Sequence, residues 1–316
     1  MNFINNFNNL SRDIKNYIQQ ISKIHKFKNR KTSLLDGILF KLLYTIKNAT
    51  QESVTTKLNL YNKIDASRVA YIKKINKINV NTFHKLHNYF NNNINNQYII
   101  YAVDGTYIQL KESLTTDCKR KKNTGSVTTL STGIYNVTYD TPTLIKIENN
   151  ETSEKISFSN IFDEIKQTDT KDIYVFDRGY IDYKLFNKIN INNKYFICRI
   201  KKNTLKIDNS KDDFIITTTF YDNSKKIKYE KLRVVKYIIN NSIFYLGTNL
   251  FNGFDIKSLK DIYHKRWSIE EYFKMLKNTT NINNINEESI KNIDKSFICY
   301  NIISKLTYLR YVYNKY

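Results

Sequence analysis

The spacing of apolar and polar positions divides the chain into a helical first part and a mixed second part. From residue 10 to about 95, apolar side chains recur at helical spacing, most clearly between Ser33, a candidate N-cap, and Ile46. Further amphipathic stretches are predicted at 51–60, 65–77 and 79–90. Lysines stand between the apolar positions of the later stretches. The pattern is equally typical of a small DNA-binding module and of a helical bundle with solvated lysines.

Short β-favouring runs begin at Gln97 and alternate with helical stretches. Strands are predicted at Tyr98–Val103, Ile134–Thr138, Thr143–Ile147, Ile173–Phe176 and Tyr195–Ile200. Helices are predicted at about 154–167 and 182–189. Strands that alternate with helices indicate an α/β fold with some parallel pairing.

This alternation breaks between about 201 and 241, where three runs predict a β-rich excursion: Thr217–Phe220, Ile227–Tyr229 and Leu232–Ile239. A strand at 242–248 and helices at about 257–277 and 287–314 follow. The last helix is amphipathic, which is typical of core packing. The predicted organisation is a helical region over 1–96, an α/β domain over 97–280 and a C-terminal helical segment over 281–316.

The charge of the chain favours a polyanionic partner. The sequence has 51 Lys and Arg against 29 Asp and Glu, a net charge of +22, and nucleic acid is the first candidate for such a field. The same sequence over-uses Asn, Lys, Ile and Tyr and has 1 Pro and 7 Gly, as the codon bias of an A+T-rich genome would produce. Charge alone therefore leaves both explanations open.

Membrane and secretory classes are not indicated. No apolar run reaches the roughly 18 residues that a membrane span needs, and the polar start Met1–Asn9 does not resemble a secretory signal. Cys118, Cys198 and Cys299 are far apart and form no CxxC pair. This spacing is typical of reduced thiols rather than of a disulfide framework or a zinc site, so we expect an intracellular, DNA-associated protein.

Two acidic residues come directly after apolar strands. Asp104 follows YIIYAV and Asp177 follows IYVF. Carboxylates at the C-terminal ends of strands lie at the edge of a sheet, where open α/β folds place their sites. Each residue alone is equally compatible with an ordinary turn, because Asp is common there.

The segment Tyr263–Lys277, which reads YHKRWSIEEYFKMLK, combines cations with a carboxylate on one helix face. On a continuous helix, four side chains form one stripe about 21 Å long: Tyr263, Arg266, Glu270 and Lys277. An adjoining apolar stripe can attach the helix to a core. The polar stripe is compatible with a solvated ion-pair ladder or with a phosphate grip beside a metal-held carboxylate.

The spacing Tyr-x2-Arg-x3-Glu-x6-Lys resembles the signature of the insertion-sequence-four family of DDE transposases. Asp104-Gly105-Thr106 resembles the first motif of that family, an Asp-Gly-Thr/Ser after an apolar strand. Within FDRGYIDY, Asp177, Gly179 and Tyr183 resemble the second motif. The resemblance covers about 98–280, with the three motifs in the family's order.

This resemblance implies an RNase H-like catalytic domain with a β-rich insertion between the second Asp and the Glu, which the excursion at 201–241 fits. It implies that Asp104, Asp177 and Glu270 are the catalytic residues and the ligands of two Mg²⁺ or Mn²⁺ ions. Hard oxygen ligands suit these ions. The substrate is then double-stranded DNA, at transposon ends and target, bound by a homodimer.

The resemblance also implies a grip on DNA phosphate near the cleaved end by the residues matching Tyr263, Arg266 and Lys277. Trp267 either stacks on an unpaired base or packs in the core. Two other functions remain open: an RNase H-like nuclease or resolvase that cuts DNA without joining it, and a domesticated DNA-binding protein without catalysis. The presence of all three carboxylates disfavours the second of these.

Overall fold

A computed structural model describes residues 32–46, 49–89, 98–110, 127–148, 152–165, 170–201, 211–222, 225–280, 282, 292–293 and 295–303. The helical pattern expected before residue 32, Cys118 and the end of the C-terminal helix expected beyond 303 lie outside the described residues. Contacts divide the chain into two compact units. The first contains Met1–Asn93, Ile108–Thr129 and Lys274–Tyr316, and the second contains Ile94–Tyr107 and Leu130–Phe273.

The first unit is helical and draws on both ends of the chain. The described helices that lie wholly within it are α2 (Leu34–Tyr44), α3 (Gln51–Asn62), α4 (Arg68–Lys77), α5 (Val80–Tyr89) and the helical residues 295–303. One apolar core joins them, because Ile298 and Ile302 are buried with the inward side chains of α2 and α4. The predicted helices of this part are confirmed where they are described, and so is the core position of the C-terminal apolar run.

The start of α2 has a local cause. Ser33 accepts a hydrogen bond from the backbone N of Asp36 at 3.1 Å, and Asp36 Oδ2 accepts one from the backbone N of Ser33 at 2.6 Å. This reciprocal capping satisfies two backbone donors that the first helical turn leaves open. The predicted N-cap at Ser33 is confirmed.

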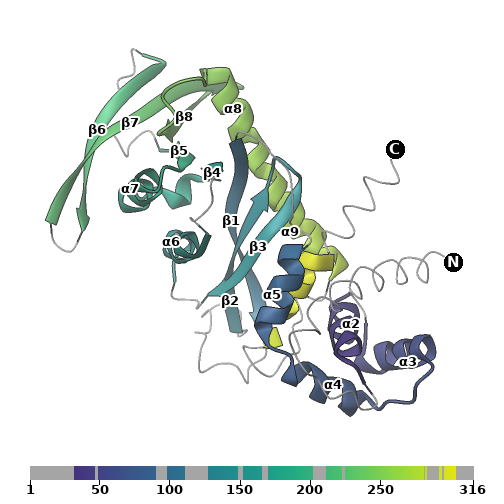
Figure 1. The fold of residues 1–316 in the computed structure, drawn as a ribbon. Helices are drawn as coiled ribbons and strands as arrows, with labels where there is room; N and C mark the ends of the chain where they lie inside the picture. Colours follow the sequence, from purple (N-terminus) through teal and green to yellow (C-terminus); the bar gives the residue numbers. More distant parts are fainter. Residues whose placement is uncertain are drawn as a thin grey trace. The chain divides into compact units, whose positions relative to one another are not determined.

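The second unit is built on one large sheet (Figure 1), and most of its strands match predicted ones. The strands are β1 (Tyr98–Leu110), β2 (Val127–Asn136), β3 (Thr141–Glu148), β4 (Lys171–Phe176), β5 (Tyr195–Ile200), β6 (Asp213–Asp222), β7 (Lys225–Ile239) and β8 (Ser242–Thr248). Their order is β3-β2-β1-β4-β5-β8-β7-β6. β1 pairs with β4, and β4 with β5, in parallel, whereas the pairs β2–β3, β5–β8, β7–β8 and β6–β7 are antiparallel. The predicted α/β fold with some parallel pairing is confirmed.

Alternating side chains of the central strands pack on opposite faces of the sheet. Tyr174 and Phe176 of β4 are buried with α6 (Glu154–Ile165) and α7 (Tyr183–Ile191). Ile173 and Val175 of the same strand are buried with α8 (Ile256–His264). Successive side chains of a strand point to opposite faces, so both faces of β4 are covered by helices. Figure 1 shows α6 and α7 on one side of β1 and β4, and α8 on the other.

Two sequence predictions differ from the structure. The first is the end of β1, which the sequence predicts just before Asp104 and which lies at Leu110. The strand continues past Ala102, the last residue that pairs with β4. The β-rich excursion is a hairpin, β6–β7, whose second strand pairs with β8 and so extends the main sheet. Its antiparallel pairing satisfies the backbone groups that would otherwise form an open edge at β8. Among the described residues, no helix is both long and apolar enough to cross a membrane.

Candidate active site

Asp104 lies on β1 just past the segment that pairs with β4. The last pair of that ladder joins Ala102 and Val175, so Asp104 stands at the edge of the parallel part of the sheet. Its Oδ1 accepts a hydrogen bond from the backbone N of Gly105 at 2.9 Å. Its Oδ2 lies 3.5 Å from Nη1 of Arg266, and its side chain is 20% exposed. The carboxylate is thus mostly buried.

Asp177 directly follows β4, as predicted, and caps a short 3-10 helix, Arg178–Tyr180. Its Oδ1 accepts a hydrogen bond from the backbone N of Gly179 at 2.6 Å. Its backbone O accepts one from Sγ of Cys198 on β5 at 3.2 Å. A side chain at Gly179 would begin 3.0 Å from Asp177 Oδ1, so the glycine of this motif keeps space beside the carboxylate.

The predicted single helix over 257–277 is wrong in one detail. A 3-10 turn, Lys265–Trp267, separates α8 from α9 (Ser268–Thr279), and the backbone N of Ser268 bonds to the carbonyl O of Lys265 and of Arg266. A 3-10 turn is tighter than an α-helical one. The joint brings the side chains of the turn toward the first turn of α9.

Glu270, in that first turn, is held by two neighbours. Arg266 Nη2 donates to Glu270 Oε1 at 2.6 Å, and Trp267 Nε1 donates to Glu270 Oε2. Because Arg266 also lies against Asp104, its guanidinium joins two of the three predicted carboxylates, and it is only 14% exposed. The structure therefore brings Asp104, Glu270 and Arg266 into direct contact.

The other residues of the predicted stripe have different surroundings. Burial raises the pKa of Tyr263, against the opposing effect of the nearby Arg266 charge. Trp267 is 56% exposed, so the core-packing alternative for this residue is wrong. Lys277 is half-buried on the last turn of α9, two helical turns from Glu270, and burial lowers its pKa. That turn is assigned to the first unit.

A fourth carboxylate, not singled out from the sequence, lies at the same edge of the sheet. A side chain at Gly105 would begin 2.6 Å from Oε1 of Glu154, which is in the first turn of α6. Glu154 Oε2 is also within 3.8 Å of the point where a side chain at Gly179 would begin. The only sequence signal is an acidic residue at the start of the helix that follows β3, and that position is common for Glu in any helix.

The electrostatics of this cluster favour a bound cation. Burial raises the pKa of Asp104 to about 6, with Arg266 opposing and the charges of Asp177 and Glu270 adding to the rise. Burial also raises the pKa of Glu154, and the charges of Asp104 and Asp177 raise it further. A single guanidinium therefore does not balance the negative charge, and a divalent cation would stabilise the ionised carboxylates.

The oxygen donors of these residues suit a divalent metal ion, but the side chains do not form a complete ligand set. Carboxylate oxygens are the donors that Mg²⁺ and Mn²⁺ prefer. In the described part of the chain, no three His, Cys, Asp or Glu side chains stand together at metal-binding spacing. Both oxygens of Glu270 are already engaged, one by Arg266 and one by Trp267. Glu270 would have to exchange these bonds for the ion.

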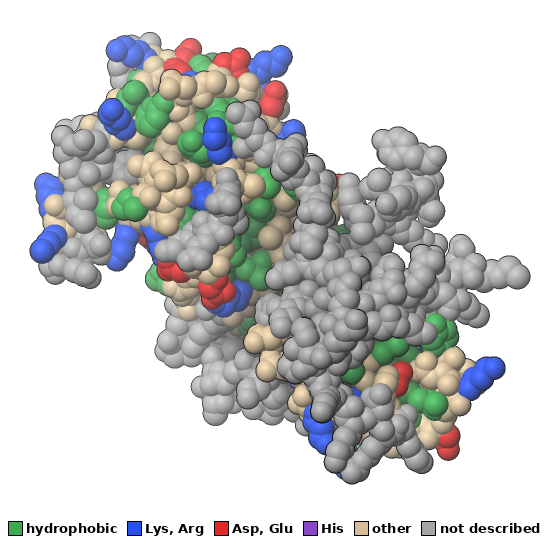
Figure 2. Space-filling view, in the orientation of Figure 1, with side chains coloured by type: hydrophobic (Ala, Val, Ile, Leu, Met, Phe, Trp, Pro, Cys, Tyr) green, Lys and Arg blue, Asp and Glu red, His purple; other side chains and the backbone are tan. Residues whose placement is uncertain are grey.

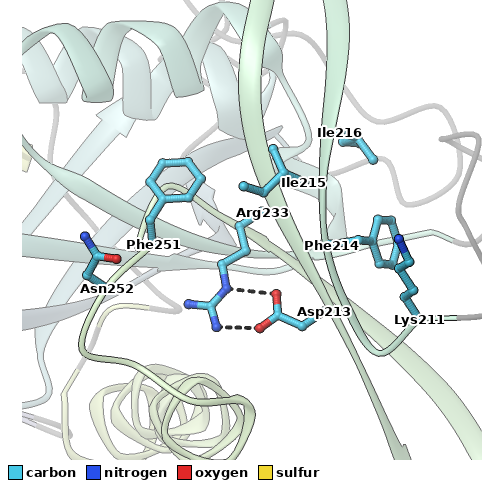
Figure 3. A pocket seen from close by; sticks show the side chains of 8 residues that line it. All are labelled: Lys211, Asp213, Phe214, Ile215, Ile216, Arg233, Phe251 and Asn252. Carbon is cyan, nitrogen blue, oxygen red and sulfur yellow. Dashed lines mark hydrogen bonds and ion pairs between the residues drawn. The ribbon is translucent and has the colours of Figure 1, made fainter.

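A depression of about 650 Å³ lies elsewhere on the second unit (Figure 3). It is lined by residues of β6 and β7 and of the loop after β8, among them Asp213, Arg233 and Phe251. Its carboxylate is already paired, because Arg233 Nη2 and Nε lie 2.6 Å and 3.0 Å from the oxygens of Asp213. Arg233 also donates to two backbone carbonyl groups of the loop. These bonds hold the hairpin to the loop after β8, and we do not assign the reaction to this depression.

Similar proteins fall in one functional class. Residues 95–298 match the family described as "Transposase DDE domain". A Synechocystis sp. protein named "Putative transposase for insertion sequence element IS4SA" is 33% identical over 136 residues, 40% of this chain and 38% of that protein. The match thus spans less than half of the relative's length. A piggyBac transposase in a synaptic complex with hairpin DNA has a TM-score of 0.49 and 9% identity, over 94% of this chain and 71% of that chain.

The matched range, 95–298, contains Asp104, Asp177, Glu154 and Glu270 and covers more than half of the chain. The resemblance to DDE transposases of the insertion-sequence-four type, first seen in the three sequence motifs, is confirmed by the family match and the relative together. The chain belongs to the transposase DDE domain family.

Proposed function

We propose that the chain is a DNA transposase that cleaves strands at transposon ends and joins the freed 3′-hydroxyl to target DNA. The observation that carries this proposal is the meeting of Asp104 and Glu270 around Arg266, with Asp177 at the end of the neighbouring strand. The first and last of the three motifs are more than 160 residues apart in the sequence, yet their side chains meet at one edge of one sheet. A domesticated protein without catalysis would have no need to keep this arrangement.

We assign residues 97–280 to an RNase H-like catalytic domain. The parallel strands β1, β4 and β5 beside the antiparallel hairpin β2–β3 support this assignment. The hairpin β6–β7 stands where the β-rich insertion at 201–241 is expected, between Asp177 and Glu270. We infer a DNA-binding role for the helical residues within 1–96, and a homodimer on DNA.

In this proposal Asp104, Asp177 and Glu270 hold two Mg²⁺ or Mn²⁺ ions. Such ions, when bound, would activate the attacking oxygen and stabilise the leaving oxygen of an in-line displacement. This reaction requires no Ser, Cys or Tyr nucleophile from the chain. The carboxylates position the scissile phosphate, and the backbone N of Gly105 and of Gly179 orient the first two of them.

Arg266 has two successive partners in this scheme. Without DNA its guanidinium joins Asp104 and Glu270. If these carboxylates held cations instead, the guanidinium would be free to bind a DNA phosphate, for which its planar fork is suited. Tyr263 and Lys277 lie before and after it in the sequence and complete the phosphate grip. The exposed ring of Trp267 is available to stack on an unpaired base.

Binding of duplex DNA without metal is expected to weaken steeply with salt. The chain carries +22, and each phosphate that it neutralises contributes about −0.9 to the slope of log K against log salt. On the face in Figure 2, Lys and Arg side chains are spread among other residues, so we expect several separate phosphate contacts. Fluorescence anisotropy at several salt concentrations measures the slope. A slope near zero would contradict a role for the charge in DNA binding.

Replacing Arg266 with Lys is expected to slow strand cleavage by about 10- to 100-fold at saturating DNA. The substitution keeps the charge but removes the fork, and a hydrogen bond to a charged group is worth about 1.5–3 kcal/mol. The exposed Arg68, which pairs with Glu52, provides a matched control, because at saturating DNA any weaker binding by Arg68→Lys should leave the cleavage rate unchanged. Equal rates for wild type and Arg266→Lys would show that Arg266 does not grip the phosphate.

The products of the reaction separate a transposase from a nuclease. Candidate transposon ends are incubated with the chain and a supercoiled target plasmid, with and without Mg²⁺. The proposal predicts end cleavage and end-to-plasmid joints that both require Mg²⁺. Nicks without joints would favour the nuclease or resolvase.

A further inference from the structure

Glu154 approaches the carboxylate cluster from the opposite face of the sheet. Val103 is buried with α6, and because strand side chains alternate, Gly105 faces α6 as well while Asp104 faces the other side. Gly105 has no side chain, and Oε1 of Glu154 occupies the space, 2.6 Å from where a Cβ would stand. The missing side chain thus opens the sheet edge to Glu154.

The same carboxylate reaches the second aspartate. The point where a side chain at Gly179 would begin lies 3.0 Å from Asp177 Oδ1 and 3.8 Å from Glu154 Oε2. Both glycines of the two aspartate motifs therefore border Glu154. Among the described residues, no hydrogen bond or ion pair of the Glu154 side chain is found.

An independent feature beside Glu154 also points to a ligand. Tyr180 is fully buried, and its hydroxyl has no hydrogen-bond partner among the residues that the structure describes. The phenol is close enough to Glu154, Asp104 and Asp177 for their charges to act on it. A buried hydroxyl without a partner destabilises the fold. An unpartnered hydroxyl beside these carboxylates therefore points to a ligand at the same place.

We propose that Glu154 is a fourth carboxylate ligand of the divalent-cation site formed by Asp104 and Asp177. This inference rests on the proposed function, because it adds a ligand to the same metal centre. A helix N-terminus favours an acidic side chain in its first turn without any metal. A carboxylate exposed to solvent would be enough to stabilise the helix N-terminus. Glu154 instead points into the sheet edge, against two glycines and two like charges.

Binding of Mn²⁺ alone to the full chain, without DNA, tests the inference. Free Mn²⁺ is followed by electron paramagnetic resonance during a titration. Glu154→Gln keeps the side-chain volume and removes one negative ligand, so the affinity for Mn²⁺ should fall about tenfold or more, since ligand charge sets affinity. Glu164, on the same helix and paired with Lys146, is the matched control, because Glu164→Gln should bind as the wild type does.

The outcomes separate this inference from the proposed function. Asp104→Asn should also weaken Mn²⁺ binding. If Asp104→Asn weakens it and Glu154→Gln does not, the metal centre stands and Glu154 is not a ligand. If the wild type binds no Mn²⁺, or Asp104→Asn binds as the wild type does, the metal centre itself is contradicted, and this inference with it. Circular dichroism checks that Glu154→Gln is folded, and if it is not, Glu154→Asp, which retains the charge, should bind Mn²⁺ more tightly than Glu154→Ala.

Discussion

Asp104→Asn and Asp177→Asn are each expected to slow strand cleavage by about 10³-fold or more, since charge stabilisation by bound metal is worth several kcal/mol and about 1.4 kcal/mol is tenfold. Each substitution removes one negative ligand with little change in volume. The backbone N–H donors of Gly105 and Gly179 still find an oxygen on Asn, so the fold and metal-free DNA binding should be retained. Single-turnover cleavage of end DNA measures the effect.

Two comparisons make this prediction specific. Asp212 is 67% exposed and pairs with Lys236, so Asp212→Asn should cleave at nearly the wild-type rate. The double variant Asp104→Asn, Asp177→Asn should be no slower than either single variant, because ligands of a shared centre act as a unit. Additive losses, or a loss of less than about tenfold for either single variant, would contradict a shared metal centre.

The second large effect concerns stability. Asp172→Asn is expected to lower the free energy of unfolding by about 3–5 kcal/mol, the range for breaking a buried ion pair. Lys194 Nζ lies 3.0 Å from Asp172 Oδ2, and the two side chains are 3% and 1% exposed. Lys194 also donates to the carbonyl O of Thr170 at 2.6 Å. Asp172 is on β4, the strand that leads to Asp177, so this pair fixes the strand on which the site depends.

Denaturant unfolding of a double variant identifies the cause. Adding Lys194→Met to Asp172→Asn removes the buried charge that the single variant leaves behind, and should recover most of the lost stability. The exposed pair Lys188–Asp163 is the control, because Asp163→Asn should cost no more than about 1 kcal/mol. A double variant as unstable as Asp172→Asn alone would show that the charge of Lys194 is not the reason.

Much of the fold follows from local patterns in the sequence. The apolar run Ile173–Phe176 alternates between two buried faces, and a short run of four such residues is readable as a strand without knowledge of its neighbours. The position of Asp177 at the end of this strand could be predicted for the same reason. The end of β1 could not, because Asp104 and Gly105 give no sign that the strand continues past them to Leu110.

The contacts between the polar side chains of the site could not be predicted from local sequence patterns. Glu154 is 50 positions from Asp104, and only the folded sheet brings α6 to Gly105. The spacing of Arg266 and Glu270 predicted one helix face, whereas the 3-10 turn between α8 and α9 lets Arg266 reach Asp104 as well. The sequence motifs named the residues, and tertiary contacts determine which of them lie close together.

The most direct test of the central claim is strand transfer by Glu270→Gln. A pre-cleaved transposon end with a free 3′-hydroxyl is incubated with a target plasmid and either Mg²⁺ or Ca²⁺. The wild type should form joints with Mg²⁺, and bind the end without joining it in Ca²⁺, whose larger and looser shell does not hold the compact geometry. Glu270→Gln should bind the end and form no joints in either. Robust joining by Glu270→Gln would contradict a metal centre built on Asp104, Asp177 and Glu270.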